Sequence, residues 1–222
     1  MEKKVPCISS ELRRHYVSMP REIYEASGLI IWGRRIKSLV FSTDLAVIRN
    51  CNADAVLAVY PFTPQQVIAD AIIHASYMPV FCGVGGGITG GSRVIALAKD
   101  AEAEGAMGVV VNAPITADIV REMRLVVDIP IVVTVVNEQH DVKSRIDAGA
   151  SILNVSAAER TPEVVRRLRS EFTDFPIIAT GGPTGESIAR TVEAGANAIS
   201  YTPPTTTELF KQLMRGYREK QW

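Results

Sequence analysis

The sequence predicts an α/β protein that folds as a single (β/α)8 TIM barrel with a short N-terminal helical extension. Eight short runs of β-branched and apolar residues alternate with eight segments that have helical spacing and charge. The runs are apolar throughout, which is typical of strands buried on both faces of a parallel sheet. A doubly wound open sheet is the alternative, but it usually has fewer strands and a nucleotide-binding loop after the first strand, which this sequence lacks. We expect residues 1–28 to form the extension and residues 29–222 to form the barrel.

The extension contains signals for two short helices. One is expected from Glu11 and the other over residues 20–26, opened by proline and ended by Gly28. Two β-rich pieces then flank Gly33, and the second, residues 36–41, is the predicted first barrel strand. The other seven predicted strands are residues 55–60, 79–84, 107–112, 129–136, 151–156, 176–180 and 198–201. The predicted helices are residues 43–50, 64–75, 92–104, 116–126, 138–148, 162–171, 185–194 and 206–217.

The composition indicates a soluble cytoplasmic protein. Lys and Arg total 24, as do Asp and Glu, so no overall charge selects nucleic acid or a membrane surface. Three cysteines without a C-x-x-C pair do not suggest a disulfide framework. The first residues lack the apolar core of a signal peptide, and the longest strongly apolar run, residues 129–136, is too short to span a bilayer.

The functional residues of such a barrel are expected at the carboxyl ends of its strands. Two carboxylates fall there, Asp44 and Glu138, and they are the candidates for general acid–base catalysis. Each could instead be an acid at a helix start that only favours the helix dipole. Asn112 and Asn154 are further candidates, because they make the mouth of the barrel polar without adding charge. Such a mouth suits hydrogen bonding to a hydroxylated ligand.

The seventh strand opens into the sequence Thr-Gly-Gly-Pro-Thr, which is the strongest candidate for a ligand site. Adjacent glycines at Gly181 and Gly182 leave the backbone accessible to a ligand, and a helix is predicted from residue 185. The start of a helix offers unpaired N–H groups to an anion, so Thr180 and Thr184 complete the predicted site. The alternative is that the glycines only permit close packing of strand and helix.

The Thr-Gly-Gly motif resembles the phosphate-binding TIM barrels of the ribulose-phosphate-binding type, which include thiamin-phosphate synthase. The resemblance implies that the loops after strands seven and eight hold one phosphate. Strand eight departs from the family by ending without glycine, and Thr202, Thr205 and Thr206 are the expected substitutes. No Arg or Lys is expected in this grip. The chain is also similar to glycerol-3-phosphate-responsive antiterminator barrels and to uncharacterised bacterial barrels loosely labelled hydrolase.

A second glycine cluster lies after strand three. Residues 83–91 hold six glycines, and we expect Gly85, Gly86 and Gly87 to form a wall of the site. The cluster matches neither a Walker A loop nor a dinucleotide-binding fingerprint. No pattern of metal ligands is present, so neither a cofactor nor a metal is expected.

Two functions remain open from the sequence, and a third reading is an assembly protein whose extension binds a partner subunit. The first is an enzyme that acts on a small anionic, phosphorylated metabolite as a hydrolase, isomerase or lyase. The second is a non-catalytic metabolite sensor, acting through RNA as the antiterminators do, which the excess of basic residues over residues 1–37 favours slightly. A homo-oligomer is expected, because the apolar residues of the extension must pack against something. The ligand and the reaction are not fixed by the sequence.

Overall fold

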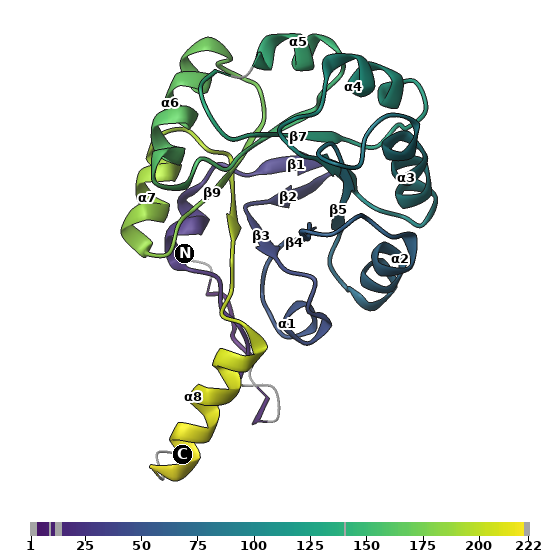
Figure 1. The fold of residues 1–222 in the computed structure, drawn as a ribbon. Helices are drawn as coiled ribbons and strands as arrows, with labels where there is room; N and C mark the ends of the chain where they lie inside the picture. Colours follow the sequence, from purple (N-terminus) through teal and green to yellow (C-terminus); the bar gives the residue numbers. More distant parts are fainter. Residues whose placement is uncertain (1–3, 9, 12–14, 140, 220–222) are drawn as a thin grey trace.

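The chain folds into a closed barrel of eight parallel strands in the computed structural model, which describes residues 4–8, 10–11, 15–139 and 141–219. The barrel closes because β10, the last strand, pairs with β3, the first. Figure 1 shows the ring of helices around these strands. The strands of the barrel are β3 (Ser38–Phe41), β4 (Ala55–Ala58), β5 (Val80–Gly85), β6 (Gly108–Val111), β7 (Ile131–Val135), β8 (Ile152–Val155), β9 (Ile177–Thr180) and β10 (Ala198–Tyr201).

One α-helix follows each barrel strand, which confirms the predicted (β/α)8 fold. A closed parallel barrel leaves no unpaired strand edge, so the backbone polar groups of every strand are satisfied by its neighbours. The helices are α1 (Leu45–Arg49), α2 (Gln66–Ala75), α3 (Ser92–Ala103), α4 (Ala117–Arg124), α5 (Val142–Asp147), α6 (Thr161–Glu171), α7 (Gly185–Glu193) and α8 (Thr206–Arg218).

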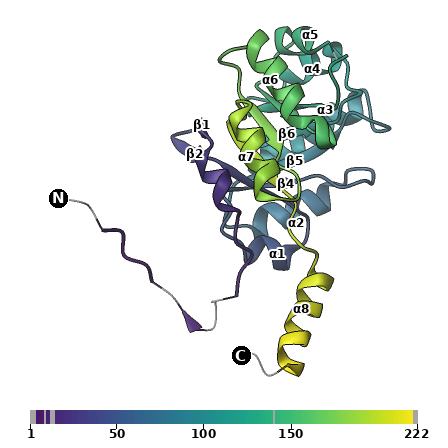
Figure 2. The same ribbon diagram turned by 90° about the vertical axis from the view of Figure 1, so that its left-hand side faces the viewer.

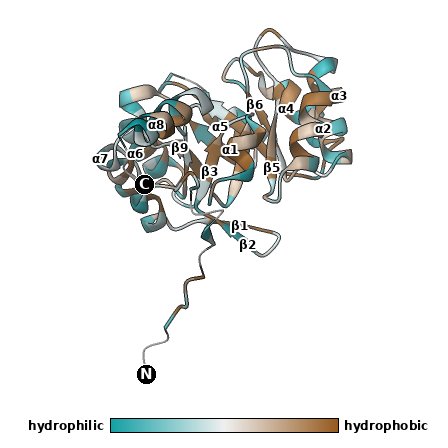
Figure 3. Cartoon of the chain, turned by 90° about the horizontal axis from the view of Figure 1, so that it is seen from below, coloured by the Kyte–Doolittle hydropathy of each residue, from teal (hydrophilic) through white to brown (hydrophobic). Residues whose placement is uncertain are grey.

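The barrel wall separates two hydrophobic cores. Side chains that point inward, such as Leu57, Phe81 and Ile178, form the interior core. Alternate side chains point outward and pack beneath the helices, as Val56 and Ala179 do. Burial on both faces explains why the strands are apolar throughout. The hydrophobic colouring of the strands in Figure 3, against helices that carry many hydrophilic residues, shows the same arrangement.

A hairpin closes the amino-terminal end of the barrel. Strands β1 (Leu29–Ile31) and β2 (Arg34–Ile36) pair antiparallel, and the turn between them has positive φ at Trp32 (48°) and Gly33 (77°). The predicted first barrel strand, residues 36–41, was therefore wrong at its start: Ile36 belongs to β2, and β3 begins two residues later. The tight turn reverses the chain before the barrel begins. Leu29, Ile31 and Ile36 of the hairpin join the interior core, whereas Ile30 and Trp32 are exposed.

The second predicted helix of the extension is present as the 3-10 helix η2 (Arg21–Glu25). It lies against α7, and Ile23 and Met19 are buried in the core outside the barrel wall, with exposed fractions of 0% and 4%. The helix expected from Glu11 falls on residues 12–14, which lie outside the described residues. The extension thus covers its own barrel from residue 17 onward, whereas Ile8 is 96% exposed. The boundary at residue 28 stays a prediction.

The last helix, α8, projects away from the barrel (Figures 1 and 2). Phe210, Met214 and Tyr217 lie at helical spacing along it and are 63%, 40% and 59% exposed. No residue of α8 within the described chain is fully buried. An exposed apolar stripe of this kind is compatible with packing against another chain, and the homo-oligomer stays a prediction.

Polar side chains fasten the amino-terminal end of the barrel. The Asp54 carboxylate accepts hydrogen bonds from the backbone N–H of Lys37 at 2.8 Å and from the backbone N–H and hydroxyl of Ser38, each at 3.0 Å. Arg169 donates to the Gly195 carbonyl at 2.8 Å and to the Asn197 amide oxygen at 2.7 Å. These bonds join the segments around the starts of the first, second, seventh and eighth barrel strands, so this end serves stability.

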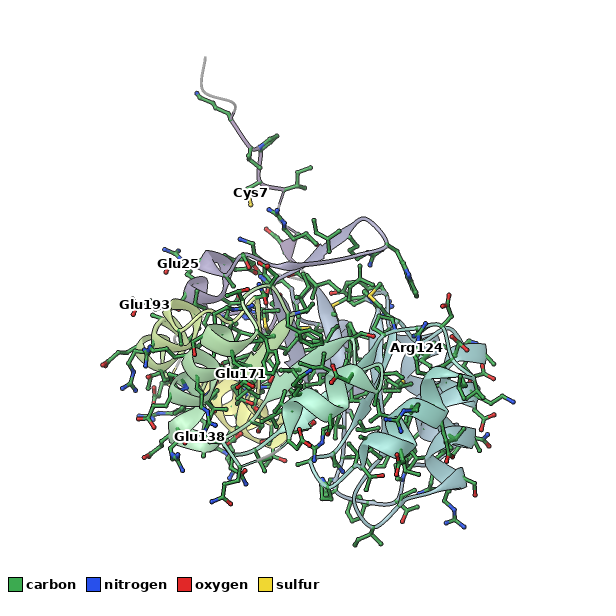
Figure 4. All side chains as sticks on the ribbon, turned by 90° about the horizontal axis from the view of Figure 1, so that it is seen from above. Cys7, Glu25, Arg124, Glu138, Glu171 and Glu193 are labelled. Carbon is green, nitrogen blue, oxygen red and sulfur yellow. The ribbon has the colours of Figure 1, made fainter. Side chains whose placement is uncertain are left out.

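Two further sequence expectations bear on the environment of the protein. Among the described residues, no helix combines the length and apolar character that crossing a bilayer requires. The three cysteines are free: Cys51 and Cys82 are buried, and Cys7 lies on the N-terminal segment that extends away from the barrel (Figure 4). The cytoplasmic location stays a prediction.

Replacement of Ile23 by Ala tests the packing of the extension. We expect Ile23→Ala to lower the free energy of unfolding by about 2–5 kcal/mol, because it removes buried methyl groups and leaves a cavity between η2 and the barrel. Chemical denaturation measures this difference. Ile8→Ala is the matched control and should have no measurable effect, since Ile8 is exposed. Equal stability of the two variants would show that the extension is not part of the folded barrel.

Candidate functional site

The carboxyl ends of the barrel strands border two cavities. The larger, of about 630 Å³, lies between the segment that follows β8 and the start of α7, and we call it the α7 cavity. The smaller, of about 280 Å³, lies over the ends of β4, β5 and β6, and we call it the glycine-loop cavity. The α7 cavity is lined by Ala158, Glu159, Arg160, Thr161, Pro162, Glu163, Thr180, Gly181, Gly182, Pro183, Thr184, Ser187, Arg190 and Thr191.

The two glycines after β9 have different roles. The Gly181 N–H donates to the Ser200 carbonyl at 3.3 Å, so it belongs to the barrel hydrogen bonding. A Cβ at Gly181 would lie 2.7 Å from Ile199 Cγ2 and 2.8 Å from Ile188 Cγ1. Gly181 therefore permits close packing of strand and helix. Gly182 has a φ of +79°, a conformation that favours glycine, and it turns the chain toward α7.

The start of α7 is held by a capping box. The Thr184 hydroxyl accepts a hydrogen bond from the Ser187 N–H at 3.1 Å, and the Ser187 hydroxyl accepts one from the Thr184 N–H at 3.1 Å. Because a helix cannot satisfy its first N–H groups internally, those of Gly185 and Glu186 remain for another acceptor. A carboxylate already stands close: a Cβ at Gly185 would lie 2.7 Å from Oε1 of Glu22 on η2.

Two arginines line the α7 cavity, which corrects the expectation that no basic side chain lies there. Arg160 donates to Glu138 at 2.5 Å and lies 3.7 Å from Glu163, so two carboxylates already neutralise it. Arg190, on the second turn of α7, has no ion-pair partner among the described residues. The sequence contained a signal for both, since Arg160 follows the end of β8 by five residues and Arg190 lies in the helix after the glycines.

The structure does not bring the threonines after β10 into the α7 cavity. Thr202 is exposed directly after β10. Thr205 caps α8 in a second capping box, in which its N–H and hydroxyl bind the Glu208 carboxylate at 2.7 and 2.8 Å. The Thr206 hydroxyl binds the Asp44 carboxylate. The start of α8 is therefore already supplied with carboxylate oxygens from this chain.

Asp44 has a structural role in the fold. Its Oδ1 accepts hydrogen bonds from the N–H groups of Ala46 and Val47 at 2.8 and 3.3 Å, so it is the N-cap of α1. The hydrogen bond from Thr206, together with these backbone bonds, holds the pKa of the Asp44 carboxyl below its ordinary value against the opposing effect of burial. A carboxylate held ionised in this way is a weak proton acceptor at neutral pH.

Glu138 is paired with arginines. Its carboxylate lies 2.5 Å from Arg160 and 3.7 Å from Arg167, and its side chain is 32% exposed. The pairing joins the segment after β7 to η3 (Ala158–Arg160) and α6. Glu138 lines a separate groove of about 120 Å³ between α5 and α6, and not the α7 cavity. Figure 4 shows it on the same side of the molecule as Glu171 of α6.

The glycine-loop cavity is lined by Gly85, Gly87 and Asn112, whereas Gly86, the third residue of the predicted wall, does not line it. Gly85 and Gly86 have φ values of 121° and 95°, and a Cβ at Gly86 would lie 2.8 Å from the Asn112 backbone nitrogen. Gly87 lines the cavity, and a Cβ there would be 3.7 Å from the Asn112 side-chain amide. Glycine is therefore required for the close approach of this loop to the end of β6. Two exposed side chains that the sequence reasoning missed, Phe62 and Ile88, make this cavity mainly apolar.

Asn154 lies inside the barrel near its carboxyl end. Its Nδ2 donates to the Thr134 hydroxyl at 3.3 Å, and its Oδ1 is buried without a hydrogen-bond partner among the described residues. Thr180 and Ser200, directly opposite each other on β9 and β10, also face inward. The inward-facing side chains at this end of the barrel, Thr134, Asn154, Thr180 and Ser200, are thus polar and uncharged, whereas the α7 cavity beside them is lined by charged residues of both signs.

One group of described side chains has the spacing of a metal site. Asp70, His74 and Glu104 lie within reach of one another, all exposed on the outer helices and remote from both cavities. Exposed carboxylates often gather in this way without an ion, so the group gives no reason to place a metal at the barrel mouth. Burial raises the pKa of the Cys82 thiol to about 12, which makes this thiol a poor nucleophile.

The closed barrel of eight parallel strands, each followed by a helix, defines a TIM barrel, and both cavities lie at the carboxyl ends of its strands, where the active sites of TIM-barrel enzymes are usually found. Comparison with solved structures agrees with this fold. Phosphoenolpyruvate phosphomutase from Streptomyces platensis subsp. rosaceus superposes with a TM-score of 0.63 at 14% identity, over 89% of this chain and 83% of that one. Phosphonopyruvate hydrolase in complex with oxalate and Mg2+ gives 0.62 at 12% identity, over 91% and 88%.

A third similar structure is also named for thiamine phosphate, as is the enzyme given with the sequence resemblance. Thiamine phosphate pyrophosphorylase from Pyrococcus furiosus has a TM-score of 0.57 at 13% identity, over 74% of this chain and 84% of that one. At these identities the likeness establishes the fold alone. No protein-family model and no curated protein matches the sequence. The similarity to antiterminator barrels and to barrels labelled hydrolase remains an interpretation of the sequence.

The structural role of Asp44 predicts a pH-dependent loss of stability. We expect Asp44→Ala to lower the free energy of unfolding by about 1 kcal/mol at pH 7, because α1 loses its cap. The pKa of this carboxyl is lowered by folding, so its contribution is present above the unfolded pKa of about 3.9 and is lost as the pH falls through the folded value.

Urea denaturation of both proteins between pH 7 and pH 3 measures this effect. The difference between native protein and Asp44→Ala should narrow below about pH 4. Asp118→Ala is the control, since Asp118 is an exposed acid in the first turn of α4 that caps no helix. A difference that stays constant over this pH range would contradict the assignment.

Proposed function

We propose that the protein is an enzyme that acts on a small anionic, phosphorylated metabolite, with the anionic group bound in the α7 cavity. The observation that carries the proposal is the combination, in one cavity, of a helix start with free N–H groups and an arginine without an ion-pair partner, Arg190. Backbone N–H groups and the helix dipole favour a phosphate at such a position. A guanidinium group adds charge-assisted hydrogen bonds.

The geometry of the α7 cavity supports the part of the predicted site after β9 more than the part after β10. Gly182 and Thr184 line the cavity with Arg190, whereas Thr205 and Thr206 are bound to carboxylates of this chain. The proposed anion site therefore depends on the loop after β9 alone. The Glu22 carboxylate near Gly185 lowers the positive potential on one side of the helix start, so the Gly182 side is the more favourable one for a ligand.

The names of two similar structures, phosphoenolpyruvate phosphomutase and phosphonopyruvate hydrolase, are compatible with an enzyme on a phosphorylated or phosphonate compound. Hydrolysis, isomerisation and elimination all remain candidate reactions. Because the carboxylates of Asp44 and Glu138 are engaged in a helix cap and an ion pair, we expect positioning and electrostatic stabilisation to contribute more than general acid–base catalysis by these groups.

The same engaged carboxylates favour a second candidate function. A barrel that binds a metabolite without converting it needs no proton donor or acceptor, and both predicted acid–base residues are occupied by structural contacts. In this alternative the bound ligand would stabilise one conformation of the chain. RNA or a protein would then bind selectively to that conformation.

Reversal of the charge of Arg190 tests the anion site. We expect Arg190→Glu to weaken binding of phosphorylated metabolites, and of inorganic phosphate, by about 10-fold or more, because a charge-assisted hydrogen bond is lost and a like charge is introduced. Isothermal titration calorimetry with a panel of small phosphorylated metabolites measures the change. Arg166→Glu is the matched control, an exposed arginine on α6 that does not line the cavity. Identical affinities of the two variants would refute the site.

Phosphorus NMR separates the two candidate functions. A metabolite identified by calorimetry is incubated with the native protein, and its phosphorus resonance is followed over time. An enzyme should produce a new resonance that Arg190→Glu slows and Arg166→Glu does not. A ligand that binds in the micromolar range and whose spectrum stays unchanged over a day would favour the sensor.

A further inference from the structure

A polar layer faces the interior of the barrel below the α7 cavity. On β8, Ile152 points into the interior core while its neighbour points outward, so Asn154, two residues after Ile152, also points inward. Thr134 is its register partner on β7. Ile178 is its partner on β9, and Thr180 lies two residues beyond Ile178, toward the mouth. Asn154 and Thr180 are therefore neighbours on adjacent strands, with Thr180 nearer the mouth of the barrel.

The side-chain amide of Asn154 is incompletely bonded. The residue is 7% exposed, and the only hydrogen bond of its side chain within the described structure joins Nδ2 to the Thr134 hydroxyl. The buried Oδ1 has no partner. A buried polar atom without a hydrogen bond costs free energy, and most such atoms in folded proteins are paired. Exchange of the amide oxygen and nitrogen would give Oδ1 the Thr134 hydroxyl and leave the NH2 group without an acceptor.

Either orientation of the amide therefore requires an additional partner. With Oδ1 free the partner must donate a hydrogen bond, and with the NH2 group free it must accept one. A hydroxyl group satisfies both cases, because it carries one donor and two acceptor sites. A carboxylate or phosphate would satisfy only the second orientation, and an ammonium group only the first.

The position of Asn154 relative to the α7 cavity indicates that its missing hydrogen-bond partner is a ligand. Thr180 lines that cavity and also faces the barrel interior next to Asn154. A molecule whose anionic end is bound at the start of α7 can thus extend past Thr180 toward the barrel axis. Asn154 does not itself line the cavity, but it is the polar side chain beside Thr180 at the border of the apolar interior core.

We propose that Asn154 binds a hydroxyl group of the metabolite whose anionic end lies at the start of α7. This inference rests on the proposed function and specifies its substrate class: phosphorylated compounds with a hydroxyl group several bonds from the phosphate. Thr134 orients the amide, and Thr180 borders the path between the two contacts. Asn154 is thus a ligand-binding residue that favours ligands with a hydroxyl group.

Two probes that share a three-carbon skeleton test the assignment. Glycerol phosphate carries hydroxyl groups, and propyl phosphate carries none. We expect the native protein to bind glycerol phosphate about tenfold more tightly, the discrimination of one buried hydrogen bond at the upper end of its usual range. Asn154→Leu, which replaces the amide by an apolar group of similar size, should reduce this ratio to near one. Its affinity for inorganic phosphate should stay within about twofold of native.

The controls separate this inference from the proposed function. Asn137→Leu removes an asparagine from the loop after β7, outside the barrel interior, and should keep the tenfold ratio. Asn154→Ala replaces Asn154→Leu if the latter does not fold. The inference is overturned if the native protein binds glycerol phosphate and propyl phosphate equally, or if the Asn154 variants keep the native ratio of the two affinities. The proposed function survives either result as long as phosphate binding still depends on Arg190. Absence of phosphate binding that depends on Arg190 overturns the proposed function and the inference with it.

Discussion

Pairing between the first and last barrel strands is the constraint on which the rest of this structure depends. Ile199 of β10 lies opposite Ser38 of β3, and its N–H donates to the Lys37 carbonyl at 2.9 Å. Closure fixes the stagger of all eight strands, and the stagger decides which side chains point inward and at what depth. The inward position of Asn154 and the meeting of Thr180 with Ser200 follow from it. A break at this seam would expose two strand edges and displace every residue of the mouth.

The two ends of the barrel differ in how their polar groups are satisfied. At the amino-terminal end, Asp54 receives three hydrogen bonds, and Asn197 bonds to Arg169, to the Ile177 N–H and to Ser27. At the carboxyl end the Oδ1 of Asn154 lacks a hydrogen-bond partner, and Arg190 lacks a counter-charge, within the described residues. Fully bonded buried networks rigidify a fold, whereas exceptions to the rules of packing and bonding gather at functional sites. The difference supports the view that stability and binding are assigned to opposite ends.

The sequence was sufficient for the barrel and insufficient for the roles of individual residues. Apolar runs buried on both faces and a repeated strand–helix unit are local signals, and they located all eight strands to within a few residues. The hairpin of β1 and β2 was missed as a separate unit, since its second strand runs into β3 with a single residue, Lys37, between them. The bond between Thr206 and Asp44 joins residues 162 positions apart. No local pattern in the sequence reports such a contact. The packing role of Gly181 likewise depends on Ile188 and Ile199, which only the folded chain brings together.

Asp44 and Glu138, the two carboxylates predicted to transfer protons, are both engaged in structural contacts. Asp44 is held ionised by the Thr206 hydroxyl and two backbone N–H groups, and proton transfer to it would weaken the cap of α1. Glu138 holds η3 and α6 through Arg160 and Arg167, so withdrawing its carboxylate from these ion pairs would loosen the wall of the α7 cavity. Either group could act as a base only at the expense of local structure.

Catalysis at this mouth would therefore draw on the orientation of a ligand held at both ends, by the start of α7 and by Asn154. Those same two contacts are sufficient for a sensor, so a single binding geometry serves both candidate functions. What distinguishes them is whether the bound ligand is chemically converted.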